Sequence, residues 1–352
     1  MKTDKCCKQH NMRIGWILAN DRSIASSRLQ GHLIHEFFLD TNIDSEIMCE
    51  NFELKHKKYS WKFLALIRNT IKKQFDVVIF VRPNWMAMKL SALLRQHSIK
   101  TIAVRCDHVP ARYDDYFDST IVPTTQLKHA LKIKRCAVID DMIEVPTDTF
   151  KTDYNDNGQY LNIVWVGHPG YCTFITNFFT QLEKHRELTR QIKVTTISSG
   201  GWASHEWAID TVFDQIIACD IAVIPIPKGE KFDIKSSNRL TMLLALGIPV
   251  IATPINAYTK IADQHPGCTL AESLDEFVEA INGLTQETQR TAMGQASRQH
   301  IRKEYSQEVI AKKWATTCSA LIESTQPKPD APRLTKLLAK CLAISAGRKS
   351  NA

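Results

Sequence analysis

The stretch DVVIFVRPNWMAMKLSALLRQHSIKTIAVR, Asp76–Arg105, contains two apolar runs on either side of a segment with a different pattern. The runs DVVIFV (76–81) and TIAVR (101–105) are apolar at nearly every position, which is typical of strands buried on both faces of a parallel sheet. Between them, NWMAMKLSALLRQ from Asn84 has the spacing of an amphipathic helix. This stretch therefore predicts a strand–helix–strand unit of a doubly wound α/β fold.

The same alternation extends in both directions and occurs in two blocks. Further strands are predicted at 13–19, 119–123 and 136–140 in the first block, and at 162–167, 193–198, 220–226 and 249–253 in the second. A polar segment with no apolar period separates the blocks. We therefore predict two tandem doubly wound, Rossmann-like domains facing a cleft, with ligands at the carboxyl ends of the strands. The predicted boundaries are a first domain at 12–146, a linker at 147–160, a second domain at 161–305, a closing helix at 306–324 and a basic tail at 325–352.

The charge of the chain, 45 Lys and Arg against 37 Asp and Glu, gives a net +8 over 352 residues. Residues 1–13 carry four Lys or Arg and one acid, and residues 326–352 carry six and one. The excess is therefore assigned to the two ends, with an electrically balanced body. This distribution argues against a basic body that grips nucleic acid.

Several protein classes are excluded by missing motifs. Ten cysteines form no C-x-x-C pair and no zinc spacing, and no export signal or run of about 18 apolar residues is present. We therefore expect a cytoplasmic protein with reduced thiols. No G-x-G-x-x-G follows a strand and no G-x-x-x-x-G-K-[ST] occurs, which argues against a nicotinamide dehydrogenase and a P-loop enzyme.

The tail after Thr325 has three prolines and then apolar residues at helical spacing, with Lys336 and Lys340 off the apolar face. This pattern is typical of a short basic helix on an anionic membrane surface, here the inner face of the membrane, to which the protein would bind peripherally. A helix packed on the protein itself, or a disordered tail, is the alternative.

The segment KSSNRLTMLLALGIPVIA, Lys235–Ala252, follows the strand DIAVIPI. Ser236, Ser237 and Asn238 are helix-capping residue types placed before an apolar helical run, and Gly247 is placed to end that helix. Backbone N–H groups at a helix start attract anions, and Lys235 and Arg239 are four residues apart. The segment suits a diphosphate; a capped helix with two solvated cations is the alternative.

The pattern CDIAVIP…KSSNRLTMLLALGIPVIATP resembles the nucleotide-sugar end of the group 1, family 4-like glycosyltransferases of the GT-B fold. NIVWVGHPG resembles the glycine loop that opens the donor domain of that family, and the residues from Arg290 to Trp314 resemble its closing segment. The resemblance covers most of residues 12–324 and is strong from about Asn162 onward.

The resemblance implies a hexosyltransferase-like glycosyltransferase that moves a sugar from a nucleotide diphosphate sugar to a glycan or lipid-linked acceptor. The expected setting is cell-surface polysaccharide synthesis. It implies an acceptor-side first domain, a nucleotide-sugar-binding second domain and retention of configuration. No D-x-D is present, so no essential metal and no cofactor is expected. The donor-binding residues it implies are Gly167, His168, Lys235, Ser236, Ser237, Asn238 and Arg239, with Lys235 and Arg239 stabilising the leaving diphosphate.

Two more segments follow strands of the first domain. Ser26, Ser27 and Arg28 are implied as acceptor-side or phosphate contacts, with a capped helix and a surface arginine as the alternative. His108 follows TIAVR beside Asp107 and is a candidate acid or base toward the acceptor hydroxyl.

The chain departs from the family at one motif. Many members place two glutamates eight apart before A-x-G-x-P, and the corresponding positions here are Ile234 and Met242. Two other functions therefore stay open on the same fold: a non-catalytic protein that binds sugar nucleotides or glycans, and an epimerase acting on the nucleotide sugar.

Overall fold

The computed structural model describes residues 12–52, 61–107, 115–155, 158–227 and 229–324. Contacts divide the chain into two compact units. The first takes the described residues up to Pro123, Lys128–Ile139 and those from Ala311 onward, and the second takes Thr124–Leu127 and Asp140–Ile310. Each unit holds one six-stranded sheet, in the order β2-β1-β3-β4-β5-β6 in the first and β12-β11-β10-β7-β8-β9 in the second. The predicted fold class of two doubly wound α/β units is confirmed.

The first sheet consists entirely of parallel neighbours, as its apolar strands predict. The inner strand β3 is buried at every position. The strands are β1 (Arg13–Leu18), β2 (Asp44–Cys49), β3 (Val77–Val81), β4 (Lys100–Val104), β5 (Ser119–Val122) and β6 (Cys136–Val138).

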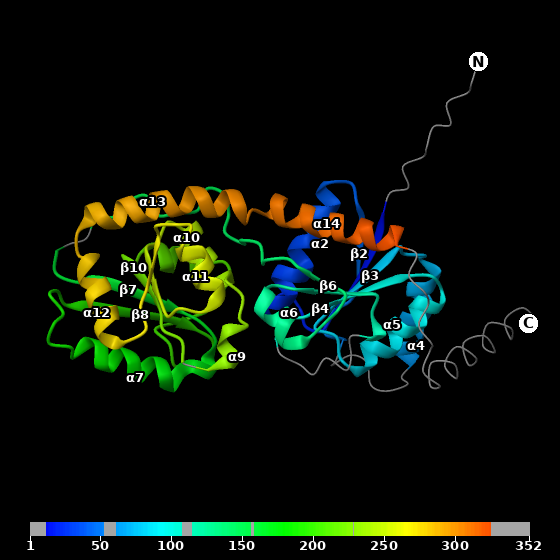
Figure 1. Cartoon of the computed structure of the whole chain (residues 1–352), viewed down its shortest axis with the longest axis horizontal. Helices are drawn as coiled ribbons and strands as arrows, with labels where there is room; N and C mark the ends of the chain where they lie inside the picture. The colour runs from blue at the N-terminus through cyan, green and yellow to red at the C-terminus, as the bar shows by residue number, and fades with distance from the viewer. Residues whose placement is uncertain (1–11, 53–60, 108–114, 156–157, 228, 325–352) are drawn as a thin grey trace, which may run out of the picture. The chain divides into compact units, whose positions relative to one another are not determined.

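Helices cover both faces of this sheet (Figure 1). Successive residues of a strand point to opposite faces of the sheet. Ile17 of β1 packs into the core cluster formed with α4 and α5. Its neighbour Trp16 packs on the other face, with ring centroids 6.2 Å from Phe38 of α2 and 5.8 Å from Trp314 of α14. The helices of this unit are α1 (Ala25–Ser27), the π-helix η1 (Arg28–His32), α2 (Leu33–Asp40), α4 (Trp61–Lys72), α5 (Trp85–Gln96) and α6 (Thr125–Leu131), which the unit boundary crosses, and most of α14 (Gln307–Glu323).

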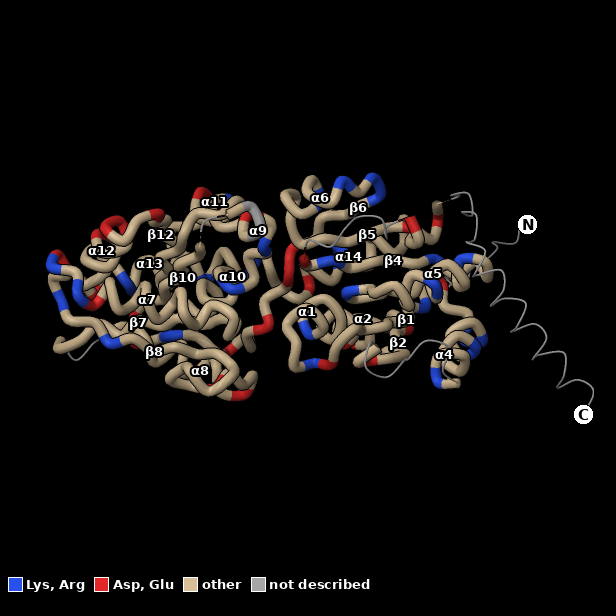
Figure 2. The backbone as a smooth tube through the Cα atoms, turned by 90° about the horizontal axis from the view of Figure 1, so that it is seen from below, with Lys and Arg blue, Asp and Glu red and all other residues tan. Residues whose placement is uncertain are grey.

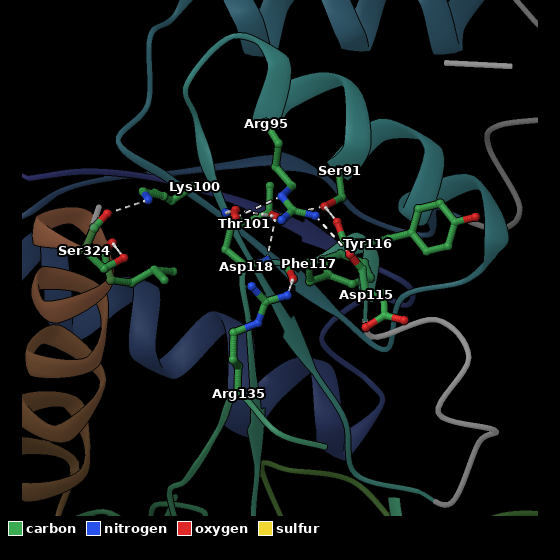
Figure 3. Close-up of polar contacts among 11 residues, drawn as sticks. Ser91, Arg95, Lys100, Thr101, Asp115, Tyr116, Phe117, Asp118, Arg135 and Ser324 are labelled. Carbon is green, nitrogen blue, oxygen red and sulfur yellow. Dashed lines mark hydrogen bonds and ion pairs between the residues drawn. The ribbon is translucent and has the colours of Figure 1, made fainter. Parts of the chain in front are cut away.

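A buried polar network ties α5 to β4 and β5 (Figure 3). Arg95 Nε donates to Asp118 Oδ1 at 2.9 Å, and the other carboxylate oxygen accepts from the backbone N–H of Thr101 at 2.8 Å. Both charged side chains are almost fully buried. Nearby, Lys100 Nζ donates to the carbonyl of Ser324 at 2.9 Å, so the chain end of α14 is fastened to this unit.

The second sheet is also parallel throughout. Val164 and Ala222 belong to the core under α8, α10, α11 and α13, whereas Trp165 and Val223 belong to the core under α7 and α12. The elements are β7 (Leu161–Val166), η3 (Pro169–Tyr171), α7 (Cys172–Glu183), β8 (Ile192–Ser198), β9 (His205–Glu206), α8 (Val212–Ile217), β10 (Ile221–Ile224), α9 (Glu230–Asp233), α10 (Asn238–Ala245), β11 (Val250–Ala252), α11 (Asn256–Ala262), β12 (Cys268–Leu270), α12 (Leu274–Gly283) and α13 (Glu287–Glu304).

Residues 147–160, which the sequence analysis treats as a linker, lie in the second unit. Arg302 of α13 donates to the carbonyls of Pro146, Thr147 and Thr149 at 2.7–3.0 Å. The hydroxyl of Tyr154 donates to the carbonyl of Gly247 at 2.8 Å. These hydrogen bonds hold the polar segment in place, and its lack of an apolar period gave no sign of them.

Two segments were assigned differently by the sequence. Residues 44–49, rich in polar side chains, form the edge strand β2, which needs apolar residues on one side only. The spacing of HEWAIDTVFDQIIAC from His205 predicts one long helix, and this prediction is wrong, because the strand β9 and a turn precede a shorter helix, α8. Among the helices that the structure describes, none combines the length and apolar character needed to cross a bilayer. The predicted tail at 325–352 lies outside the described residues.

Candidate functional site

Three loops of the second unit meet at the carboxyl edge of its sheet. The loop Gly167–Tyr171 follows β7, and the loop with Gly200 follows β8; a Cβ on Gly200 would lie 3.7 Å from Cβ of Pro169. The rings of Tyr171 and Phe232, the latter on α9, have centroids 6.1 Å apart. The carboxyl edge of a parallel sheet is where doubly wound folds bind ligands.

The helix α10 begins at Asn238, as predicted. Ser237 occupies the N-cap position, and its side chain makes no capping hydrogen bond, although serine is a capping residue type. Ser237 is buried, and its carbonyl accepts from the N–H of Thr241 at 2.9 Å. The N–H groups of the first turn therefore receive no bond from the cap side chain, which is the condition under which a helix start binds an anion.

Arg239 is half-buried in the first turn of α10, with its guanidinium carbon 5.8 Å from the centroid of the Trp165 ring. Its charge also acts on Tyr258: burial raises the pKa of that phenol, and Arg239 opposes the rise. Lys235 is half-buried in the segment before the helix. Because Lys235 precedes α10 and Arg239 lies in its first turn, the four-residue spacing does not place the two cations on one helical face.

The glycine loop after β7 is shaped by the side chains beside it. A Cβ on Gly167 would come within 2.6 Å of the Trp165 ring, so only glycine fits. His168 Nδ1 accepts from the N–H of Gly170 at 3.0 Å. In the neutral ring this bond places the proton on Nε2, which can then donate to a phosphate or sugar oxygen.

Three buried polar atoms near this edge have no hydrogen-bond partner: Trp165 Nε1, Trp202 Nε1 and Ser198 Oγ. The two indole rings lie 5.6 Å apart between centroids. A buried donor without a partner costs about 1–3 kcal/mol, so such groups commonly serve a ligand or water. The sequence analysis did not select these residues. The sign that could have found them was a tryptophan and a serine near the carboxyl ends of two predicted strands.

The positions that carry glutamates in many relatives are apolar and buried here. Ile234 is 8% exposed and Met242 is 9% exposed. Neither side chain offers a hydrogen bond to a ribose or a sugar, so recognition of those groups would have to come from other residues.

The loop after β1 in the first unit contains the predicted acceptor-side residues. Ser26 and Ser27 have buried hydroxyls without a hydrogen-bond partner. Arg28 is buried and donates to the carbonyls of Arg22 and Ser23 at 3.1 and 3.2 Å. Arg28 is therefore not the surface arginine of the alternative interpretation; it fastens its own loop at the carboxyl end of β1.

The remaining candidate, His108, lies outside the described residues and stays a prediction. Its neighbour Asp107 pairs with Arg82 at 3.5 Å. Within the described ranges, no group of three His, Cys, Asp or Glu side chains could hold a metal ion.

A family model described as glycosyl transferase-like matches residues 180–316, which is less than half of the chain. No curated protein matches the sequence. This region includes the loop after β8, the segment Lys235–Arg239 and helix α10.

Solved structures match over nearly the whole chain. HepE from Anabaena, solved in complex with UDP and glucose, is 11% identical with a TM-score of 0.64, covering 88% of this chain and 100% of its own. Sucrose-phosphate synthase from Thermosynechococcus elongatus is 10% identical, with a TM-score of 0.62 and coverages of 88% and 99%. A glycosyltransferase from Rickettsia africae is 11% identical, with a TM-score of 0.60 and coverages of 90% and 100%. At these identities the likeness establishes the fold, and together with the family model it confirms the predicted resemblance to GT-B glycosyltransferases.

Proposed function

We propose that this chain transfers a sugar from a nucleotide diphosphate sugar to a glycan or lipid-linked acceptor. The observation that carries the proposal is the start of α10, where Arg239 and N–H groups without a side-chain cap lie at the carboxyl edge of the second sheet, inside the glycosyl transferase-like region. That HepE was solved with UDP-glucose supports a nucleotide-sugar donor.

In this proposal, the chemistry of the site is electrostatic. Negative charge grows on the diphosphate as the bond to the sugar breaks. Arg239, Lys235 and the positive end of α10 would balance that charge, which lowers the barrier without a bound metal. His168 would donate from Nε2 to a phosphate or sugar oxygen, and retention of configuration is the stereochemical outcome we propose from the resemblance.

The setting of the reaction is a further part of the proposal. The basic tail would hold the enzyme peripherally at the cytoplasmic face of a membrane, where lipid-linked acceptors for polysaccharide synthesis are presented. The positive charge of residues 326–352, six Lys or Arg against one acid, supports this placement.

A second candidate function is binding of a sugar nucleotide without transfer. The buried apolar side chains of Ile234 and Met242, in place of the glutamates of many relatives, favour it. Calorimetric titration with a panel of UDP- and GDP-sugars tests the site itself. We expect saturable binding of at least one donor, lost in Lys235→Ala/Arg239→Ala; binding that persists in this variant would contradict the assigned site. Donor consumption without acceptor would indicate epimerase or hydrolase chemistry.

A further inference from the structure

Helix α4 of the first unit presents an outer face that its own fold does not use. Its inner face carries Phe63, Leu66 and Ile67, which are buried in the core beneath α5. On the opposite side, Trp61 is 83% exposed. The outer face of α4 consists of the exposed residues Trp61, Lys62, Ala65, Arg68, Asn69 and Lys72.

The spacing on this helix places an indole and two cations in one stripe. Trp61, Arg68 and Lys72 are at positions i, i+7 and i+11, which share one side of an α-helix. Lys62 flanks the stripe. The helix contains no acidic residue, and its Lys and Arg positions stand out in Figure 2.

The surroundings of α4 are also short of negative charge. Residues 61–105 contain nine Lys or Arg and one acid, Asp76, whose carboxylate accepts from the N–H of Arg13 at 2.8 Å. On the neighbouring strand β2, Glu46 pairs with Lys73. Buried Arg95 pairs with Asp118. Asp76, Glu46 and Asp118 are thus each paired, and Lys62 and Lys72 are exposed on the outer face of α4.

This changes the charge distribution inferred from the sequence. Residues 14–325 hold 35 charges of each sign, so those outside 61–105 hold 26 Lys or Arg and 34 acids. The charges of residues 14–325 therefore cancel in total, but they are unevenly distributed along the sequence. The stretch 61–105 carries a local excess of positive charge in addition to the two ends of the chain.

We propose that the outer face of α4 binds the surface of an anionic lipid bilayer. Trp61 would lie among the headgroups, where an amphipathic indole is favoured, and Lys62 and Lys72 would face the lipid phosphates. The chain's own tail is a poor occupant of this face, because residues 326–352 are themselves positively charged. The proposal goes beyond sugar transfer and does not rest on it, since vesicle binding is measured without donor.

The first test is sedimentation of the full chain with vesicles of phosphatidylcholine, with and without phosphatidylglycerol. We expect binding only to the anionic vesicles, weakening with salt. Each neutralised lysine should weaken partitioning about fivefold, so Lys62→Gln/Lys72→Gln should weaken it about 25-fold. A matched control, Lys184→Gln/Lys303→Gln, removes two exposed lysines of the second unit and should bind as wild type.

The second test separates α4 from the tail, which contains no tryptophan. Lipids brominated near the headgroups should quench the fluorescence of Trp61 in wild type, and Trp61→Phe should remove that component. The tail variant Lys336→Gln/Lys340→Gln should weaken binding but retain Trp61 quenching. Equal binding of the two double variants Lys62→Gln/Lys72→Gln and Lys184→Gln/Lys303→Gln, or identical quenching of wild type and Trp61→Phe, would overturn the proposal. Binding that requires RNA or an acidic protein in place of lipid would also overturn the proposal.

Discussion

Arg239 lies over Trp165, with 5.8 Å between its guanidinium carbon and the centroid of the indole ring. This contact joins the first turn of α10 to the carboxyl end of β7. A cation beside an aromatic face in a half-buried setting is held in a narrow range of positions. The same indole carries a buried N–H without a partner, so cation and donor lie at one edge of one sheet.

Replacing Arg239 by alanine should weaken donor binding by about 10- to 100-fold, because a charge-assisted hydrogen bond to phosphate contributes about 1.5–3 kcal/mol. Calorimetry with the best donor of the panel measures the change. Arg239→Lys should recover part of the affinity, since lysine keeps the charge but lacks the planar fork. Lys260→Ala, on the exposed side of α11, is the matched control. Equal losses in Arg239→Ala and Lys260→Ala would show that only net charge matters.

Replacing Tyr154 by phenylalanine should destabilise the second unit by about 1–2 kcal/mol. The hydroxyl is buried and satisfies the carbonyl of Gly247, where the chain turns after α10 with φ of +78°. Urea unfolding of both variants measures the effect. Tyr160→Phe is the control, because Tyr160 is 39% exposed and should change stability by less than about 0.5 kcal/mol. An equal, small change in both variants would mean that the segment around Tyr154 is not held by this bond.

Replacing Asp118 by alanine should destabilise the first unit by about 3–5 kcal/mol, because it leaves the guanidinium of Arg95 buried without its charge partner. The double variant Arg95→Met/Asp118→Leu should be more stable than Asp118→Ala, since it removes both charges. Thermal unfolding of the three chains compares them. A double variant less stable than Asp118→Ala would indicate that the pair itself stabilises the fold.

The stability of the first unit should fall as the pH drops below about 6.5, partly through His35. Trp16 Nε1 donates to Ser45 Oγ at 2.9 Å, and that hydroxyl is hydrogen-bonded to His35 Nδ1 at 2.8 Å. Burial lowers the pKa of His35, and it also lowers the pKa of His32. The unfolded chain then binds protons at a higher pH than the folded chain, so acid favours unfolding. His35→Gln should reduce the difference in urea midpoint between about pH 7.5 and about pH 5.5; an unchanged difference would contradict this role.

The sequence predicted those parts of the fold whose pattern is set by burial on both sides. β3 is apolar throughout and β4 is buried at every position after Lys100, because helices cover both faces, and α10 begins at Asn238 because an apolar helical run starts there. β2 was missed, because an edge strand can carry polar residues such as Asp44 and Glu46. Pairings between distant residues, such as Arg302 with the carbonyl of Thr147, leave no local pattern.

The sequence pointed to the two cations of the candidate site, but not to the buried polar residues near them. Lys235 and Arg239 stood out because charge next to a helix start suggests an anion. Trp165 and Ser198 did not, since a residue at the end of an apolar strand looks like core until its polar atom is found buried without a partner. The role of Arg28 toward the acceptor stays a prediction, and the hydrogen bonds of its guanidinium to the carbonyls of its own loop could not be read from the sequence.

The central claim is that the start of α10 carries transfer from a nucleotide sugar. The most direct measurement is the rate of UDP or GDP release from the bound donor, with and without a glycan or lipid-linked acceptor, in wild type and in Lys235→Ala/Arg239→Ala. The account predicts acceptor-dependent release in wild type and a fall of at least about 100-fold in the variant, whose thermal unfolding should match wild type. Acceptor-dependent release at an unchanged rate in the folded variant would contradict it.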